Sequence, residues 1–477
     1  MAKRTKIVAT IGPSSRDPKM LRALFLAGVN VARLNFSHGT HAEHAAVIAE
    51  VRAIAADLGM HVAVLQDLPG PKVRTGPLAD GAPSVLLANG APFTLTTDAV
   101  SGTSARVGVS YAGLARDVEA GKHIYLADGS ISLRIESVDG SDVHTRVESG
   151  GALRPLQGIN YPDGTLALDA VTDRDFEHLA FGLDAGVDWV AVSFVRSAAD
   201  IERVRAFMTE RGKIVPIMAK IEKHEALEDI EAIVQAADGI MVARGDLGVE
   251  VLLEDVPLIQ KDLIARANRA SKPVVTATQM LESMISSPRP TRAEATDVAN
   301  AILDGTDAVM LSGETARGQF PLEAVRTMAT IAEAVEKQYP HARFHRRHSV
   351  DVDLRSSDDI GTTIAEAAAS GAERLDLQLI VTGTTTGNTA RYISSFRPRA
   401  KIIGLTPLPD VARQMAMIWG VESVLVQPYR YIETLIEIAE QRVVADGLAK
   451  SGETIAITSG MPVGAGGTNV LKIHRLP

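Results

Sequence analysis

The sequence predicts an α/β protein, with a (β/α)8 TIM barrel, an inserted small all-β lid domain and a C-terminal α/β doubly wound domain. Three observations predict this fold. Short apolar runs alternate with segments of helical spacing eight times. One stretch interrupts the alternation with strand and turn signals only, and a second, shorter series of strands and helices follows the eighth unit.

The first part of the chain contains two complete βα units and the strand of a third. We expect strands at residues 6–11, 29–34 and 62–66. Helices are expected at residues 17–27 and 41–58, where Gly28 and Gly59 end them because glycine adopts the left-handed conformation that terminates helices.

The stretch from about Gly70 to Asp163 is rich in glycine and loses helical spacing. Strands are expected at residues 93–97, 123–127, 130–137 and 143–148. Asp128-Gly129 and Asp139-Gly140 stand between these runs, and Asp-Gly between apolar runs is a strong hairpin signal. The stretch therefore predicts a small all-β insertion.

The alternation of strands and helices then resumes. Expected strands are residues 188–192, 214–219, 239–242, 273–277 and 307–310, and expected helices are residues 172–184, 255–270 and 295–303, with a last helix that opens at Pro321. Eight units within about 240 residues, once the insertion is removed, favour a closed barrel over an open sheet.

Domain limits follow from these patterns. The predicted barrel comprises residues 1–69 and 167–342, the predicted β-barrel lid residues 70–166, and the predicted C-terminal regulatory domain residues 355–477. A polar, basic linker is expected at residues 341–357. The C-terminal domain alternates expected helices (360–369, 389–395) with expected strands (377–382, 401–405).

Composition limits the class of protein. The 477 residues are 46% hydrophobic and 22% charged, with a net charge of −9, which argues against a general nucleic-acid or anionic-membrane binder. The chain has no cysteine, so thiolate catalysis and disulfides are excluded. No window resembles a membrane span, and the run after the basic start is too short for a signal segment, so we expect a cytoplasmic protein.

Charged side chains end two neighbouring predicted strands. Lys220 and Glu222 point to the same side of an extended run, and Asp246 follows the next strand beside Gly245. Two carboxylates without histidine or cysteine suit Mg²⁺ or Mn²⁺. A lone charge at a strand end is usually solvated, but the coincidence on successive strands favours a site.

Further candidates end other strands. Arg33 could bind a phosphate through paired hydrogen bonds. His38, taken singly, fits a structural hydrogen-bonding role better than the role of a catalytic base. Asp67 opens a Pro/Gly-rich segment that is equally readable as a rigid linker. Thr278 stands at an expected helix start, where capping is the usual role and is compatible with anion binding.

Seven strings, in this order, resemble the pyruvate kinase family nearly end to end. They are KIVATIGP (6–13), RLNFSHG (33–39), AKIE (219–222), MVARGDLG (241–248), ATQMLESM (277–284), RPTRAE (289–294) and MLSGETA (310–316). The resemblance implies a glycolytic, cytoplasmic phosphotransferase that moves the phosphoryl group of phosphoenolpyruvate to ADP and then protonates the enolate to pyruvate.

The resemblance also implies roles for individual residues. Glu222 and Asp246 would hold the Mg²⁺ or Mn²⁺, Lys220 would stabilise the transferring phosphoryl group and the enolate, and Arg33 would bind the phosphoryl group. Gly245, Asp246 and Thr278 would receive the substrate carboxylate, and Thr278 could order the water that supplies the proton. Nucleotide contacts would come from Asn35, Phe36, Ser37, His38 and Arg74.

Some positions depart from the family pattern. Asn35, Ser37 and Asp67 match ligands of the K⁺ site, whereas Leu68 and Lys72 stand where K⁺-dependent members have Thr and Glu. We therefore expect activity without K⁺, with the Lys72 ammonium in place of the ion. Arg174 and Gln157 replace usual lysines, so nucleotide contacts there are not expected to follow the pattern.

The segment Thr384, Thr385, Thr386, Gly387, Asn388 and Thr389 resembles the family's effector loop, but it reads equally as a polar turn. It contains no lysine or arginine, and the later loop 460–467 is glycine-rich. A bisphosphate effector is therefore not expected, whereas AMP or a sugar monophosphate stays open. The family usually forms homotetramers. Two alternatives stay open: a metal-dependent, enolate-forming aldolase or lyase, and a non-catalytic phosphometabolite sensor.

Overall fold

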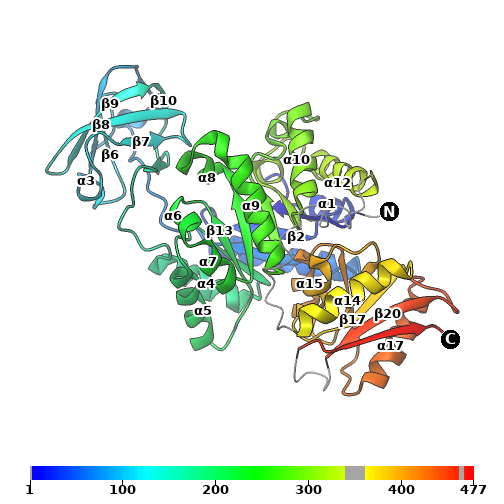
Figure 1. The fold of residues 1–477 in the computed structure, drawn as a ribbon. Coiled ribbons are helices and arrows are strands. Elements are labelled where there is room, and N and C mark those ends of the chain that lie inside the picture. Colours follow the sequence, from blue (N-terminus) through cyan, green and yellow to red (C-terminus); the bar gives the residue numbers. More distant parts are fainter. Residues whose placement is uncertain (1–2, 339–359, 461–466) are drawn as a thin grey trace.

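The computed structural model describes residues 3–338, 360–460 and 467–477. A central barrel carries a β-rich domain on one side and an α/β domain on the other (Figure 1). The expected linker at residues 341–357 lies outside the described residues.

Eight parallel strands close into the expected barrel. In ring order they are β1 (Lys6–Thr10), β16 (Ala308–Leu311), β15 (Val274–Ala277), β14 (Gly239–Ala243), β13 (Ile217–Ile221), β12 (Trp189–Val192), β3 (Ala63–Asp67) and β2 (Val31–Asn35). Every strand residue points either into the barrel or toward the surrounding helices, so nearly all of them are buried and apolar. The prediction of eight βα units in this order is confirmed.

Eight helices, one after each strand, surround the barrel. They are α1 (Pro18–Leu26), α2 (His41–Asp57), α4 (Asp173–Ala185), α5 (Ala198–Glu210), α7 (Ile230–Ala236), α9 (Val256–Arg269), α10 (Arg292–Asp304) and α12 (Pro321–Gln338). Threonine N-caps with an acidic third residue start α2, α4 and α10. Left-handed Gly186 and Gly305 end α4 and α10.

Short helical segments lie at the rim or within loops. These are α6 (Glu225–Glu228), α8 (Arg244–Glu250), η2 (Leu253–Asp255), η3 (Glu282–Ile285) and α11 (Gly313–Ala316).

The interior of the barrel is apolar and is closed from below by the C-terminal domain. Trp189, Met218, Met241 and other strand side chains form one cluster with Ala416 and Met417 of η5 (Met415–Met417). The indole N–H of Trp189 donates to the carbonyl of Gln414 at 3.1 Å. The two domains therefore share a core.

The insertion between β3 and α4, here called the lid, is built from strands. They are β4 (Val85–Leu87), β5 (Pro92–Thr96), β6 (Arg106–Gly108), β7 (His123–Leu126), β8 (Ile131–Asp139), β9 (Asp142–Ser149), β10 (Gly151–Leu153) and β11 (Ile159–Asn160), with the short turns η1 (Ala79–Gly81) and α3 (Leu114–Asp117). They pair as a six-stranded sheet and a two-stranded sheet, rather than as one ring like that of the large barrel. Both expected Asp-Gly hairpins are present.

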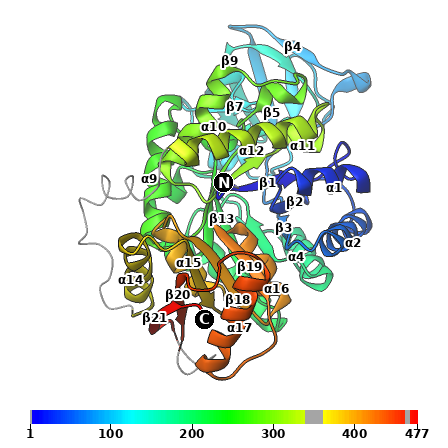
Figure 2. The ribbon, with the colours of Figure 1, turned by 90° about the vertical axis from the view of Figure 1, so that its right-hand side faces the viewer.

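The C-terminal domain is a five-stranded sheet flanked by helices, with the strand order β19-β18-β17-β20-β21. Its strands are β17 (Leu379–Gly383), β18 (Lys401–Thr406), β19 (Val421–Leu425), β20 (Thr454–Ser459) and β21 (Val470–Arg475), and only β21 is antiparallel. Its helices are α14 (Ile360–Arg374), α15 (Asn388–Ser395), α16 (Pro409–Gln414) and α17 (Ile432–Ala445). Figure 2 shows this domain below the barrel, with the N-terminus near their junction.

Two local expectations are wrong. Thr278 opens no helix; it and Gln279 have φ of +69° and +55°, and the next helical turn begins only at Glu282. Residues 214–216 do not belong to β13, and Ile214 is exposed. Asp246 follows β14 as expected, and it lies in the first turn of α8.

Candidate active site

The side chain of Lys220 lies at the centre of a buried cluster on the carboxyl-terminal rim of the barrel. Its Nζ is 3.0 Å from Glu222 Oε1, 3.2 Å from Asp67 Oδ1 and 2.7 Å from the hydroxyl of Ser193. These residues come from the ends of β13, β3 and β12, so adjacent strands bring them together. The structure confirms that Lys220 and Glu222 share one side of β13.

Arg33 joins this cluster through Asp67. Its Nε donates to Asp67 Oδ2 at 2.6 Å, and its Nη1 donates to the hydroxyl of Thr10 at 2.8 Å. β2 and β3 pair in register, so Arg33 lies opposite Leu65 and two residues before the position opposite Asp67. These two hydrogen bonds fix the orientation of the guanidinium. They place a second positive charge close to Lys220, which shares Asp67 with Arg33.

The charges of the cluster shift its titration. Burial alone would raise the pKa of Asp67, but the neighbouring Lys220 and Arg33 lower it further than burial raises it. Burial would lower the pKa of Lys220, and Asp67 and Glu222 raise it instead. At neutral pH the site therefore holds an ammonium and a carboxylate as a charged pair.

Glu222 differs from Asp67 because its charge is incompletely compensated. Its side chain is 2% exposed, and burial raises its pKa; Lys220 opposes that shift and the nearby Asp246 reinforces it. Its Oε2 also accepts the backbone N–H of Phe194 at 2.8 Å. Two neighbouring carboxylates that repel each other fit a hard divalent cation such as Mg²⁺, which favours oxygen ligands.

Thr278 connects the substrate side of the site to α8. Its hydroxyl accepts the N–H of Gly245 at 2.7 Å and donates to the carbonyl of Ala277 at 2.6 Å. Arg244 donates to the Thr278 carbonyl at 2.7 Å and pairs with Asp297 at 2.7 Å. Thr278 therefore caps a helix, but not one that it opens itself. The capped helix is α8, which follows the neighbouring strand β14.

Lys72 lies beside a metal-ligand candidate rather than in the expected K⁺ site. Its Nζ is 2.8 Å from Asp246 Oδ1 and 3.9 Å from Asp128 Oδ1. The ammonium thus bonds to Asp246 and not to Asn35, Ser37 or Asp67. Leu68 is buried, and the Asn35 amide oxygen accepts the backbone N–H of Ser37 at 3.0 Å.

The expected nucleotide contacts are dispersed. Phe36 is 2% exposed and stacks on His44 at 4.0 Å between ring centroids, so its side chain belongs to the core. His38 is exposed, and its carbonyl bonds to His44 Nε2 at 2.9 Å. Arg74, on the lid, donates to the Leu156 carbonyl at 3.0 Å. Within residues 35–38, only the exposed side chains are therefore accessible to a nucleotide in this structure.

Three further residues belong to the site and were not predicted from the sequence. Ser193, Phe194 and Thr10 contact Lys220, Glu222 and Arg33 respectively. A signal for Ser193 was present, because it directly follows β12 and the other site residues were found at just such strand ends. Phe194 contributes a backbone N–H and has a φ of +54°, and side-chain patterns do not encode such a contact.

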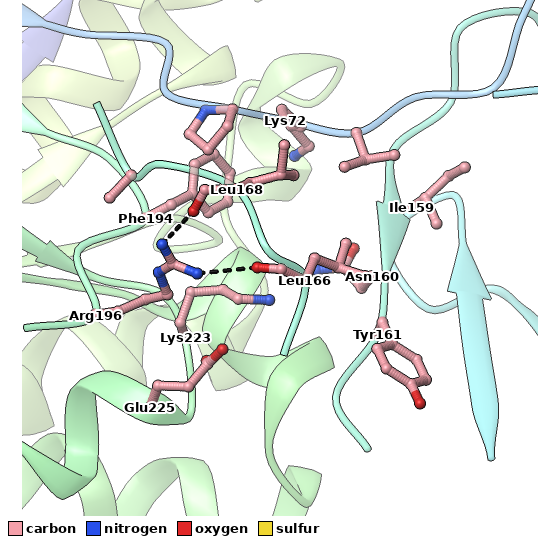
Figure 3. Close-up of a pocket in the computed structure, with 13 residues that line it drawn as sticks. Lys72, Ile159, Asn160, Tyr161, Leu166, Leu168, Phe194, Arg196, Lys223 and Glu225 are labelled. Carbon is pink, nitrogen blue, oxygen red and sulfur yellow. Dashed lines mark hydrogen bonds between the residues drawn. The ribbon is translucent and has the colours of Figure 1, made fainter. Parts of the chain in front are cut away.

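A small pocket of about 50 Å³ lies where the lid meets the barrel (Figure 3). Arg196 donates from the barrel to the carbonyls of Leu166 and Leu168, on the chain that returns from the lid. Lys72 and Phe194, which bond to the two metal-ligand candidates, line the same pocket. The pocket therefore adjoins the site and is lined by both segments that connect the lid to the barrel, here called the hinge.

The expected effector loop is closed by its own hydroxyls. Thr384 Oγ1 accepts the N–H of Gly387 at 2.8 Å and that of Thr386 at 3.3 Å, and Thr389 bonds to Thr468. Thr385, Thr386 and Asn388 are exposed, and α15 begins at Asn388. Most of the glycine-rich loop at 460–467 lies outside the described residues.

Comparisons with known proteins agree along the whole chain. Residues 2–325 match the model of the pyruvate kinase barrel domain, and residues 362–474 match that of the pyruvate kinase alpha/beta domain. Pyruvate kinase 2 of Synechocystis sp. is 47% identical, over 99% of this chain and 79% of its own length. Pyruvate kinase of Geobacillus stearothermophilus is 44% identical, over 99% and 80%.

A solved structure gives the same result. The crystal structure of a pyruvate kinase from Cryptosporidium parvum superimposes with a TM-score of 0.93 and 37% identity. The match covers 100% of this chain and 96% of that one. No described helix is long and apolar enough to cross a membrane.

Proposed function

The chain belongs to the pyruvate kinase family and is a phosphotransferase that converts phosphoenolpyruvate and ADP to pyruvate and ATP, and we propose that the Lys220 cluster performs this reaction. The observation that carries the proposal is the position of the Lys220 ammonium, within 3.2 Å of Asp67 and Glu222 oxygens and in a site with little access to water. A buried cation of this kind is available to charge that develops on the substrate.

The residues divide the work of phosphoryl transfer. Arg33 and Lys220 bind the phosphoryl group and stabilise its charge, and Lys220 also stabilises the enolate oxygen. Gly245 and Thr278 position the substrate carboxylate, and Thr278 orders the water that protonates the enolate. Glu222 and Asp246 hold Mg²⁺ or Mn²⁺, which when bound neutralises charge on phosphoryl and carboxylate oxygens.

Nucleotide binding is assigned to the loop after β2 and to the lid. Asn35, Ser37 and His38 present polar groups at the rim, Phe36 holds the loop in place from the core, and Arg74 faces ADP from the lid. Closure of the lid then excludes water, which would otherwise accept the phosphoryl group.

A coupled assay with lactate dehydrogenase tests the function. Pyruvate release should require both phosphoenolpyruvate and ADP, together with Mg²⁺, and Lys220→Ala should abolish it. Lys213→Ala is the control, because Lys213 is an exposed lysine before the same strand, paired with Asp184. Pyruvate formation without ADP would favour the aldolase or lyase alternative, and binding without turnover would favour a sensor.

We also propose that the chain needs no added K⁺. Lys72 supplies a cation next to Asp246, although it does not lie among Asn35, Ser37, Asp67 and Leu68. The rate should be unchanged when K⁺ is replaced by tetramethylammonium, and Lys72→Glu should make it depend on K⁺. A wild-type rate that collapses without K⁺ contradicts this proposal.

The remaining assignments concern regulation and assembly. A phosphorylated effector is proposed at Thr384–Thr389.

A homotetramer is proposed as the assembly. The exposed Leu252, Leu253 and Leu258 give η2 and α9 an apolar surface that suits a subunit contact. Light scattering after size exclusion measures the mass, and a monomer would contradict the second proposal.

A further inference from the structure

A second, basic cavity of about 250 Å³ lies between the barrel and the C-terminal domain. It carries five cationic side chains and one carboxylate, from Lys3, Arg4, Lys6, Arg399, Lys401 and Glu422. The first three precede or begin β1, and the others lie at the starts of β18 and β19. The cavity is therefore at the amino-terminal ends of these strands. Figure 1 shows that the C-terminal domain, which supplies part of the lining, lies on the side of the barrel away from the lid.

The positive charge of this cavity is poorly neutralised. Lys401 pairs with Glu422 at 2.6 Å, and it is the only one of the five cations with an ion pair in the described part of the chain. Lys3 donates to the amide oxygen of Asn30 and Lys6 to the carbonyl of Val421, each at 2.7 Å. These acceptors satisfy hydrogen bonds but supply no negative charge.

Burial makes this imbalance costly. It lowers the pKa of Lys3 to about 7; Lys6 lowers it further, and Glu336 and Glu333 oppose the shift only in part. It also lowers the pKa of Lys6 to about 8; Glu422, Glu336 and Asp307 oppose this shift, and Lys401 adds to it. A bound anion would add negative charge beside both ammonium groups.

The cavity is built by both domains. The guanidinium of Arg4 donates to the carbonyls of Pro398 and Arg399 and lies 5.4 Å from the centre of the Trp419 ring. The carboxylate of Glu336 is already engaged by the N–H groups of Arg4 and Thr5, at 2.6 Å each. Arg399 itself is exposed, so its guanidinium is free to approach a ligand.

We propose that this cavity binds a small phosphorylated metabolite. Arginine and lysine together match a phosphate dianion, the former through paired hydrogen bonds. The volume lies below the roughly 300–1,000 Å³ of pockets for drug-sized ligands, which favours a compact metabolite. The site is distinct from the loop at Thr384–Thr389, because that loop follows the other end of β17.

Binding would couple the two domains. The ligand contacts the start of β1 and the start of β18 at once, so it favours the arrangement in which both sets of cations converge. The inference does not depend on the proposed chemistry at Lys220, because binding to the cavity can be measured without turnover.

Calorimetry on the full chain tests the site, with glycerol 3-phosphate as the probe and sodium chloride at equal ionic strength as the blank. Arg399→Gln should weaken binding about tenfold or more, the loss expected for one hydrogen bond between charged groups. Arg430→Gln is the matched control, because Arg430 is an exposed arginine beyond the other end of β19. Thr386→Ala controls for the loop before α15.

Three results would overturn the proposal. The first is equal affinity for glycerol 3-phosphate in Arg399→Gln and the wild type. The second is a loss of binding in Thr386→Ala but not in Arg399→Gln. The third is inorganic phosphate that binds as tightly as glycerol 3-phosphate, which would identify the ion alone as the ligand. A second measurement uses an amine-reactive reagent and mass spectrometry. Glycerol 3-phosphate should slow labelling of Lys3 but not of exposed Lys450, and unchanged labelling of Lys3 would count against the site.

Discussion

The hydroxyl of Ser193 is the neutral member of the charged cluster, and with Asp67 and Glu222 it is one of three groups that hold the Lys220 ammonium. It accepts from Lys220 Nζ at 2.7 Å and donates to the Leu68 carbonyl at 2.6 Å. A hydroxyl has one hydrogen, and Ser193 donates it to the Leu68 carbonyl. The hydroxyl oxygen is therefore oriented to accept from Lys220. Ser193 is therefore a positioning residue, since it acts through Lys220.

Replacing Ser193 by alanine should lower kcat about 10- to 100-fold and leave the KM for phosphoenolpyruvate within a few-fold, because a small displacement of a catalytic group costs this much. Steady-state kinetics with the coupled assay measures both constants. Ser101→Ala, at an exposed serine of the lid, should match the wild type. An unchanged kcat in Ser193→Ala would show that Lys220 is held by its carboxylates alone.

At the residue scale, the sequence predicted side chains better than backbone contacts. Lys220 and Glu222 were predictable because alternation along a strand places them on one side. The nucleotide contact expected of Phe36 came from the family resemblance and not from a local pattern, and its side chain is buried. Lys72 could be recognised as a cation, but its bond to Asp246 depends on the path of the lid, which no local pattern specifies.

At the element scale, a buried polar latch joins the lid to the barrel. Glu250, at the end of α8, is 3% exposed and accepts from Asn160 Nδ2 of β11 at 2.8 Å. Lys223 lies 2.8 Å from the same oxygen of Glu250, and His224 Nδ1 lies 3.3 Å from its other oxygen. One buried carboxylate thus has partners on both the lid and the barrel.

This latch should make stability depend on pH. The hydrogen bond to Glu250 raises the pKa of His224 despite partial burial, so the folded state favours the protonated imidazole. The contribution is complete below the unfolded pKa of about 6.5 and is lost as pH rises through the higher folded value. The Tm difference between the wild type and His224→Asn should therefore shrink as pH rises.

Thermal unfolding of both proteins between pH 5.5 and 8.5 measures this difference. His144→Asn, on β9 of the lid sheet and away from the hinge, serves as the control. A Tm difference that stays constant or grows with pH would contradict the assignment of a protonated His224.

Elements whose ends carry caps were predicted within a few residues, whereas the turns at the rim were not. Gly186 ends α4 where expected, because a left-handed glycine is a local signal. The segment after Thr278 lacks its expected helix, and Arg244, the first residue of α8 after the neighbouring strand β14, holds the Thr278 carbonyl. Such a contact between neighbouring strands exists only once the barrel has formed.

At the scale of the whole molecule, the C-terminal domain completes the barrel core. Met417 is fully buried among the interior side chains of the barrel strands, and Arg413 pairs with the buried Asp188 at 2.7 Å. Arg397 adds a buried pair with Asp307 at 2.8 Å. The sequence predicted both domains but gave no sign that the short turn at Met415–Met417 enters the barrel.

Met417→Ala should destabilise the protein by about 2–5 kcal/mol, because it leaves a cavity in a core that both domains share. Denaturant unfolding followed by tryptophan fluorescence measures the loss, since Trp189 and Trp419 lie on either side of this junction. Met417→Leu, which nearly conserves volume, should cost less than about 1.5 kcal/mol. Equal stability of the alanine variant and the wild type would mean that the contact carries no energy.

The residues that close the barrel from below are translated about a hundred positions after its last strand, at Leu311. All eight strands are therefore synthesised before the residues that cover the methionine and tryptophan side chains at their lower opening. A chain that stops before Met417 is expected to leave these apolar side chains exposed to solvent.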